Sequence, residues 1–164
     1  MSNAPVTMTE VERATLEFVA NHRASYLASQ GREGHILDYQ HLGGHRFTTC
    51  LLLEYRGRKS GERRITPLIY GDIGGEVVVV ASKGGADVHP AWYLNLREMN
   101  EIVFQIGGQA FKSTWREPEG SEREAVWQFM ASVFPPYLGY QAATQRKIPL
   151  IMLQPGEEVP APQG

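Results

Sequence analysis

Two short basic segments carry residues suited to binding an anion. In Gly57–Gly61, glycines bracket two cations and a hydroxyl, and in Ser82–Gly85 a lysine precedes two glycines. Glycine lets the backbone approach a ligand closely, successive N–H groups can surround an anion, and lysine adds a point charge suited to phosphate. Neither segment fits the P-loop or the GxGxxG pattern. A plain turn is the alternative for each segment, whereas the two together predict one pocket for a ligand with more than one negative group.

The basic residues are concentrated, although the whole chain is slightly acidic. The formal net charge is −2, which gives the chain no general attraction to nucleic acid. Between positions 56 and 64, however, five basic residues stand against the single acid Glu62. A compact positive patch on an acidic protein suits a small anion better than a long phosphate backbone. We therefore expect a small-molecule ligand and no nucleic acid.

Aromatic side chains follow the second basic segment and a predicted helix break. Trp92 and Tyr93 come soon after the segment, and Phe134, Tyr137 and Tyr140 recur every third residue near Pro135. Core packing is the ordinary role of any one of these rings. Five rings near predicted loops also fit a site in which a planar ligand stacks. A tyrosine hydroxyl in such a site could donate a hydrogen bond or a proton.

Other chemistries have no support in the sequence. There is no GxSxG elbow, no HExxH pair and no Cys/His cluster with zinc spacing. The single cysteine, Cys50, cannot form an internal disulfide and is predicted to be a small buried hydrophobe. No charged-then-apolar signal segment opens the chain, and no run approaches the ~20 apolar residues of a membrane span. We expect a cytoplasmic protein that needs no metal.

A small, mainly β fold is expected to position these residues. A chain of 164 residues suits one domain. Strands are predicted over 47–55, 63–70, 77–81, 102–106, 110–116 and 148–153. Helices are predicted over 9–30, after Pro90, after Ser121 and over 137–144, two of them opened by the capping boxes Thr9–Glu12 and Ser121–Glu124. The hairpin-rich order predicts an α+β fold with an antiparallel sheet in a closed or split barrel.

The single domain, 1–164, is expected to have three parts. These are a tail and amphipathic helix over 1–34, with 1–6 disordered, a barrel core over 35–154, and a frayed tail over 155–164. The helix covers one mouth of its own domain, or it lies on a membrane surface or a partner. Residues 71–76 are predicted as a turn, and Pro67 restricts its strand to an edge or a bulge. The helix after Ser121 is expected to bury Ala125, Val126, Phe129, Met130 and Val133.

The motifs also occur in a recognisable order. GRKSG is followed by a strand carrying R-x-T-P-L, then by SKGG, then by H-P-x-W-Y-x-N-L. From about Leu51 to Pro155 this series resembles the deazaflavin (coenzyme F420)-dependent nitroreductase family. The resemblance implies a split β-barrel like that of FMN-binding proteins. It also implies coenzyme F420 as the cofactor, whose phosphate and oligoglutamate tail call for several cations.

The resemblance further implies roles for individual residues. The implied cofactor-binding residues are Arg58, Lys59, Arg64, Thr66, Pro67, Leu68, Val80, Ser82, Lys83, Gly84, Gly85, Trp92 and Tyr93. The substrate pocket would hold Phe134, Tyr137 and Tyr140, and the two tyrosines would be catalytic. Phe134 stands where the family has a tyrosine, so this pocket lacks one hydroxyl.

The leading hypothesis is an F420-dependent oxidoreductase. It would transfer a hydride to an electron-poor conjugated molecule such as a quinone, an unsaturated lactone, an enone or a nitroaromatic. One alternative is a non-catalytic F420 carrier, and another is an FMN- or haem-binding barrel, although the number of cations favours a polyanionic tail over one phosphate. The sequence also allows peripheral contact with a membrane and assembly into a homodimer.

Overall fold

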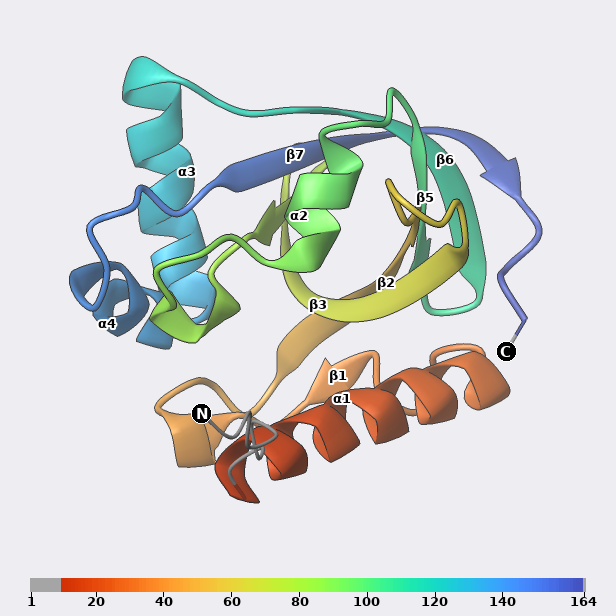
Figure 1. Cartoon of the computed structure of the whole chain (residues 1–164), viewed down its shortest axis with the longest axis horizontal. Coiled ribbons are helices and arrows are strands. Elements are labelled where there is room, and N and C mark those ends of the chain that lie inside the picture. Colours follow the sequence, from red (N-terminus) through yellow and green to blue (C-terminus); the bar gives the residue numbers. More distant parts are fainter. Residues whose placement is uncertain (1–9, 164) are drawn as a thin grey trace, which may run out of the picture.

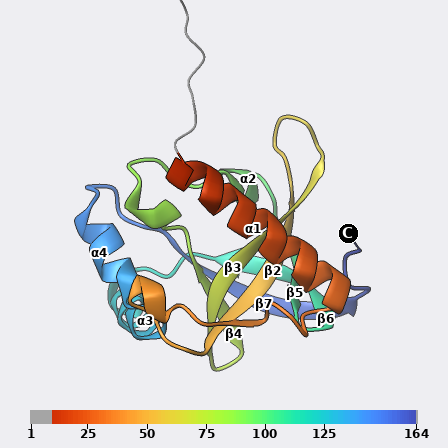
Figure 2. The same cartoon turned by 90° about the horizontal axis from the view of Figure 1, so that it is seen from below.

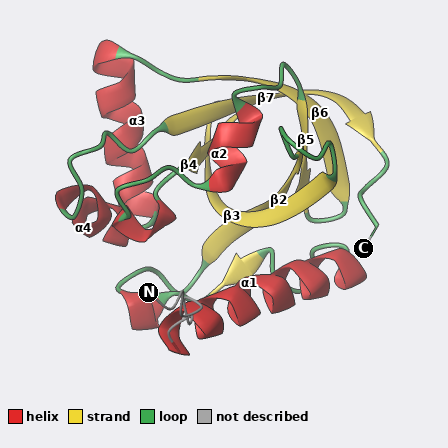
Figure 3. Ribbon diagram, viewed as in Figure 1, coloured by secondary structure: helices red, strands yellow, loops and turns green. Residues whose placement is uncertain are grey.

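The computed structural model describes residues 10–163, with the side chains of residues 11 and 12 left out. The expected disorder of residues 1–6 and the capping residue Thr9 lie outside this part of the chain. Within it, seven strands and four α-helices form an antiparallel barrel with helices packed around it (Figures 1 and 3). The predicted mainly β, split-barrel fold is confirmed.

The strands close on themselves through one pairing. Their order is β1-β2-β3-β4-β7-β6-β5, and β2 also pairs with β5, which closes six strands into a barrel and leaves β1 outside it. The strands are β1 Ile36–Leu37, β2 Thr48–Arg56, β3 Arg63–Ile73, β4 Glu76–Val80, β5 Ile102–Ile106, β6 Gln109–Arg116 and β7 Leu150–Val159. Closure pairs β2 with β5 and so removes much of the exposed sheet edge that otherwise invites aggregation.

Alternating side chains divide the core into two parts. One part lies inside the barrel and includes Leu51 and Leu53 of β2 together with Val77 and Val79 of β4. The other lies on the outer face, where Cys50, Val78 and Val80 pack against helices. Successive side chains of a strand point to opposite faces. The unbroken apolar run of β4 therefore reflects a strand that is buried on both sides.

Four helices surround the barrel. They are α1 Glu10–Ser29, α2 Ala91–Leu96, α3 Gly120–Val133 and α4 Pro136–Ala142, with short 3₁₀ turns η1 Gln40–Leu42 and η2 Lys83–Gly85. Helix α2 lies across one mouth of the barrel, whereas α3 and α4 lie to one side of it (Figure 3). Figure 2 shows α1 crossing the wall formed by β2 and β3.

Helix α1 is attached mainly through its C-terminal half. Tyr26 is 0% exposed, and its hydroxyl can donate to the carbonyls of Cys50 and Gln105 and accepts a hydrogen bond from the N–H of Gly107. Near the other end of the helix, Leu16 and Phe18 are exposed. The face predicted for this helix comprised Val11, Thr15, Phe18, Val19, His22 and Tyr26. Of its described side chains, His22 and Tyr26 are buried and Val19 is half-buried, whereas Thr15 and Phe18 are exposed.

Several predicted boundaries were wrong. The turn predicted over 71–76 is only the Gly74–Gly75 pair, because β3 continues to Ile73 and pairs there with β4. The tail predicted from 155 is part of β7, which pairs with β6 through Val159. Helix α3 begins at Gly120, and no side-chain hydrogen bond caps its N-terminus at Glu119. The predicted Ser121–Glu124 capping box therefore does not form. Of the five side chains expected on the buried face of α3, Val126 and Met130 are buried, Val133 is half-buried, and Ala125 and Phe129 are exposed.

Candidate cofactor and substrate site

An open strand edge lies at the centre of the candidate site. Residues 63–69 of β3 pair with β2 on one side, whereas β4 pairs with β3 only from Tyr70 onward. This open stretch contains four predicted cofactor-binding residues: Arg64, which is exposed, and Thr66, Pro67 and Leu68, which are half-buried. Pro67 lies at an edge as predicted, since a residue without an N–H cannot donate to a second neighbouring strand. The open edge offers backbone groups to a flat ligand.

A positively charged cavity of about 380 Å³ adjoins this edge. Its lining contains Arg23 of α1, Arg63, Arg64 and Thr66 of β3, and Tyr55 of β2. Arg23 also donates a 3.3 Å hydrogen bond to the carbonyl of Ile65, so α1 lies against the open edge. Burial raises the pKa of Tyr55, while the nearby Arg64 and Arg23 act in the opposite direction. The cavity therefore suits an anionic group, and Arg23 and Tyr55 were not predicted from the sequence.

The first basic loop is held by helix α2. Both the backbone N–H and the guanidinium of Arg58 donate to Oδ1 of Asn95, each at 2.9 Å. Asn95 is buried in α2, which fixes the start of the loop, while Lys59 is exposed. Among the residues described, the one carboxylate within ion-pair distance of these loop cations is Glu62, 3.7 Å from exposed Arg64. Most of the positive charge of the loop is available to a ligand.

The second basic loop has an unusual backbone. Ser82 is right-handed helical, and the next three residues all have positive φ: 45° at Lys83, 62° at Gly84 and 84° at Gly85. A right-handed residue followed by a left-handed one is the arrangement that gathers N–H groups into an anion-binding concavity. The N–H groups of Lys83 and Gly84 have no hydrogen-bond partner within residues 10–163. Space is open above Gly84, where an added Cβ would meet no atom within 4 Å.

The three predicted substrate aromatics form one cluster. Phe134 lies 5.0 Å from Tyr137 and 6.3 Å from Tyr140 between ring centroids, and the two tyrosines are 6.2 Å apart. Tyr39 joins them, 5.6 Å from Phe134, although nothing in its sequence surroundings indicated this. Tyr137 is 4% exposed and Tyr140 is half-buried. Burial raises the pKa of both tyrosines, so both stay protonated at neutral pH and can donate a hydrogen bond.

This cluster touches the second basic loop directly. A Cβ added to Gly85 would lie 2.7 Å from the carbonyl oxygen of Tyr140, which means that the loop and α4 meet backbone to backbone. Val80, just before the loop, is buried in the same outer core as Phe134 and Tyr137. The predicted anion loop and the predicted substrate pocket are therefore neighbours.

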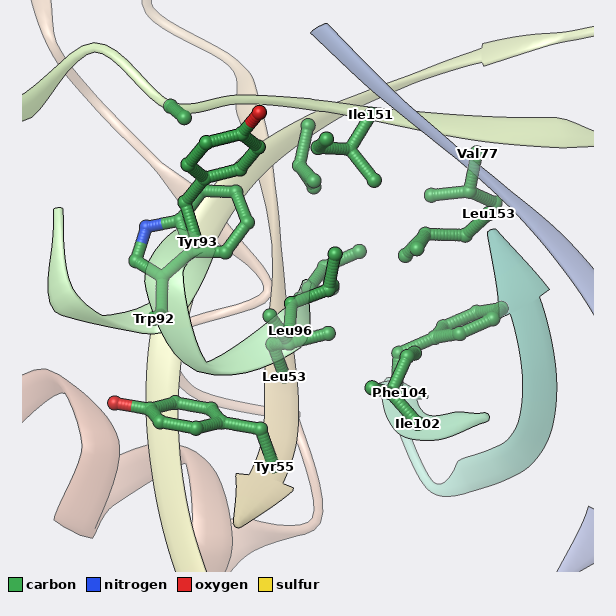
Figure 4. Packing of buried hydrophobic residues seen from close by; sticks show 13 residues of the cluster. Leu53, Tyr55, Val77, Trp92, Tyr93, Leu96, Ile102, Phe104, Ile151 and Leu153 are labelled. Carbon is green, nitrogen blue, oxygen red and sulfur yellow. The ribbon is translucent and has the colours of Figure 1, made fainter. Parts of the chain in front are cut away.

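Trp92 and Tyr93 are less accessible to a ligand than the sequence suggested. They are 6% and 5% exposed and belong to the core inside the barrel. The Tyr93 hydroxyl donates a 2.8 Å hydrogen bond to Glu117, and burial together with this bond raises its pKa to about 12. In Figure 4 the Trp92 indole nitrogen and the Tyr55 hydroxyl both lie on the side of the cluster away from Leu153 and Val77. The indole nitrogen of Trp92 thus lies on the same side of the cluster as the hydroxyl of Tyr55, a residue that lines the positively charged cavity.

Two residues that the sequence did not single out organise these loops. Asn95 holds Arg58, as described above, and Arg146, after α4, binds the carbonyls of the second basic loop. Asn95 lies within the H-P-x-W-Y-x-N-L motif but was given no role, and Arg146 lies in no recognised motif; only their contacts across the fold reveal what each side chain holds. Within residues 10–163, no three His, Cys, Asp or Glu side chains come together as a metal site, and no helix there is both long and apolar enough to cross a membrane.

Comparison with known proteins agrees with this arrangement. The model of the F420H(2)-dependent quinone reductase family matches residues 20–155. The chain is 31% identical over 135 residues to the F420H(2)-dependent quinone reductase Rv1261c of Mycobacterium tuberculosis, covering 80% of this chain and 86% of that protein.

Solved structures show the same similarity. One described as an F420-H2 dependent reductase (FDR-A) is 38% identical, has a TM-score of 0.59, and the match covers 64% of this chain and 93% of the other. Another, described as a domain-swapped dimer, is 30% identical, has a TM-score of 0.62, and the match covers 89% and 100%. From the family match and these relatives, the chain belongs to the F420H(2)-dependent quinone reductase family.

Proposed function

We propose that this protein binds F420 along the open edge of β3 and catalyses reduction of a quinone or a similarly electron-poor conjugated molecule. The observation that carries the proposal is the position of this edge beside cationic groups that few carboxylates neutralise. When bound, reduced F420 supplies the hydride, so the chemistry belongs to the cofactor. The protein binds the reactants, orients them and supplies charge.

The anionic part of the cofactor would be held by the two basic loops. Arg58, Lys59 and Arg64 supply positive charge for the oligoglutamate tail and the phosphate. The free N–H groups of Ser82, Lys83 and Gly84 would donate to the phosphate, with the Lys83 ammonium as counter-charge. The open space at Gly84 supports this fit, because a side chain there would stand where a phosphate must approach.

The planar part of the cofactor would lie against Thr66, Pro67 and Leu68. The open strand edge offers backbone donors and acceptors to a ring system, and Pro67 and Leu68 add apolar atoms on opposite faces of the strand, Leu68 toward the core inside the barrel. The indole edge of Trp92 would border the ring, and buried Val80 would support the strand beneath the loop. These contacts would exclude water from one face of the ring and leave the other face for substrate.

The substrate would lie beside the aromatic cluster. Tyr137 is enclosed, so its ring would form a wall of the pocket. Tyr140 is half-buried and protonated, which suits it to donate a hydrogen bond or a proton to a substrate oxygen that gains negative charge. Phe134 contributes shape without a hydroxyl, which favours carbonyl acceptors that need one donor over substrates that need two.

We further propose that the protein acts in the cytoplasm as a homodimer. The related domain-swapped dimer supports pairing. Exposed apolar side chains, among them Phe47 at 72% exposure and Leu16 and Phe18 of α1, support contact with a second copy or with a membrane surface. Light scattering after gel filtration tests the dimer, and vesicle co-sedimentation tests the membrane contact.

Titration of the purified protein with F420 and with FMN tests the proposed cofactor. Quenching of each cofactor's fluorescence gives the two dissociation constants, and we expect F420 to bind much more tightly. The Lys83→Ala variant should weaken F420 binding about 10-fold, since a bond to a charged group is lost. Preferential binding of FMN would mean that the loops hold an ordinary flavin phosphate.

Turnover with reduced F420 and menadione, a small naphthoquinone, distinguishes an enzyme from a carrier. We expect oxidation of the cofactor that depends on both the protein and the quinone. Tight F420 binding without turnover on menadione, an enone or a nitroaromatic would favour the carrier alternative.

A further inference from the structure

Arg146 binds the second basic loop through backbone carbonyls. Its Nε donates to the carbonyl of Ala86 at 2.6 Å, one terminal nitrogen donates to that of Ser82 at 2.6 Å, and the other donates to that of Ala81 at 3.2 Å. The last nitrogen also lies 3.1 Å from Nδ1 of His89. One planar guanidinium thus holds both ends of the loop that contains Lys83, Gly84 and Gly85.

These contacts determine where two N–H groups of the loop point. In a trans peptide, the carbonyl of one residue and the N–H of the next lie in one plane and point in opposite directions. No peptide bond of the structure is cis. Because the carbonyls of Ala81 and Ser82 face Arg146, the N–H groups of Ser82 and Lys83 face away from it. Neither N–H has a partner among the described residues.

The loop backbone needs such external support. Lys83 has a φ of 45°, a conformation that is unfavourable for a residue with a Cβ. Strained residues of this kind persist only where their surroundings hold them. The hydrogen bonds that the loop makes within itself are Gly85 N–H to Ser82 at 3.0 Å and Ala86 N–H to Lys83 at 3.2 Å. Arg146 adds three bonds from outside.

Arg146 is in turn tied to the helix that carries Tyr140. Its carbonyl accepts a 2.8 Å hydrogen bond from the side chain of Gln141, the next residue along α4. Thr144 donates to Asp87, just past the loop, at 2.9 Å. The end of α4 and the loop therefore form one connected unit.

We propose that Arg146 is a positioning residue for cofactor binding: it turns the carbonyls of the loop inward so that the N–H groups of Ser82 and Lys83 face the phosphate of F420. The proposal rests on the function proposed above. Arg146 does not touch the ligand, because its guanidinium is directed at the protein's own carbonyls and His89.

The test compares two ligands that differ in the phosphate. F420 and its chromophore without the phosphate and tail, a deazaflavin that carries only a ribityl side chain, are titrated against wild type, Arg146→Lys and Arg146→Met. Arg123→Met is the matched control, because the Arg123 guanidinium also donates to a backbone carbonyl, that of Ile148 at 2.8 Å, but does not contact the loop. The ratio of the two affinities is the readout, since partial unfolding lowers the measured capacity for both ligands equally.

We expect both Arg146 substitutions to weaken F420 binding about 10- to 100-fold, because oriented hydrogen-bond donors to a charged group are lost. Binding of the chromophore should change by less than about threefold, and the control should bind both ligands like wild type. An unchanged affinity ratio in both Arg146 variants would overturn the positioning role while leaving the proposed function intact. Failure of wild type to bind F420 at all would instead overturn the proposed function, and this proposal with it.

Discussion

The contact between the second basic loop and α4 leads to a sharp prediction for Gly85→Ala. A Cβ at this position would lie 2.7 Å from the carbonyl oxygen of Tyr140 and 2.9 Å from its Cα. Both are backbone atoms, so no side chain can rotate away to relieve the clash. The residue also has a φ of 84°, which an L-residue with a Cβ rarely adopts. The substitution must therefore separate the loop from α4.

Gly84→Ala is the matched control. Its φ of 62° carries a comparable backbone penalty, but an added Cβ there meets no atom within 4 Å. The left-handed backbone costs about 1–2 kcal/mol in either variant. Forcing an extra methyl group into packed structure adds about 1–3 kcal/mol in Gly85→Ala alone. The free energy of unfolding should therefore fall by about 1–2 kcal/mol in the control and by about 2–5 kcal/mol in Gly85→Ala.

Urea unfolding followed by tryptophan fluorescence measures both values without cofactor. In Gly85→Ala we also expect slower turnover, because Tyr140 moves with α4. Equal losses of unfolding free energy in the two variants would refute the reasoning. Such a result would mean that the loop and α4 are not in backbone contact in solution.

Three further substitutions test other contacts of the site. Asn95→Ala removes the acceptor of both Arg58 hydrogen bonds, so F420 binding measured by fluorescence should weaken about 10-fold. Unchanged affinity would show that the first basic loop does not need Asn95 to bind the cofactor. Tyr26→Phe leaves the N–H of Gly107 unpaired, so the free energy of unfolding measured by urea titration should fall by about 1–3 kcal/mol. A fall of less than about 0.5 kcal/mol would mean that this hydroxyl does not anchor α1. Tyr140→Phe should lower kcat about 100-fold at unchanged F420 affinity, and full turnover on every acceptor would exclude its proton-donating role.

The periodic parts of the chain were predictable because they depend on local patterns. Strand β4 was recognised from its β-branched run, and the β5–β6 hairpin from Gly107–Gly108 between two alternating segments. Element ends were less predictable. Strand β7 extends to Val159 despite Pro155, because β6 offers a partner across the barrel. The Ser121–Glu124 pair matched a capping pattern, yet α3 starts one residue earlier, at Gly120.

The sequence by itself determined which residue types were present for chemistry. The glycine-flanked cations and the aromatic residues predict a ligand that is polyanionic and partly planar, because charge, backbone freedom and ring stacking are properties of the residues themselves. The role of the T-P-L strand and the electron-poor substrate were implied only by the family resemblance. Whether those groups share one site was decided only by the tertiary structure. Barrel closure leaves part of β3 without a second neighbour, and the fold brings Asn95 and Arg146 to loops 37 and 60 or more residues away in the chain. Contacts across such separations arise from packing of the whole domain, and no local pattern encodes them.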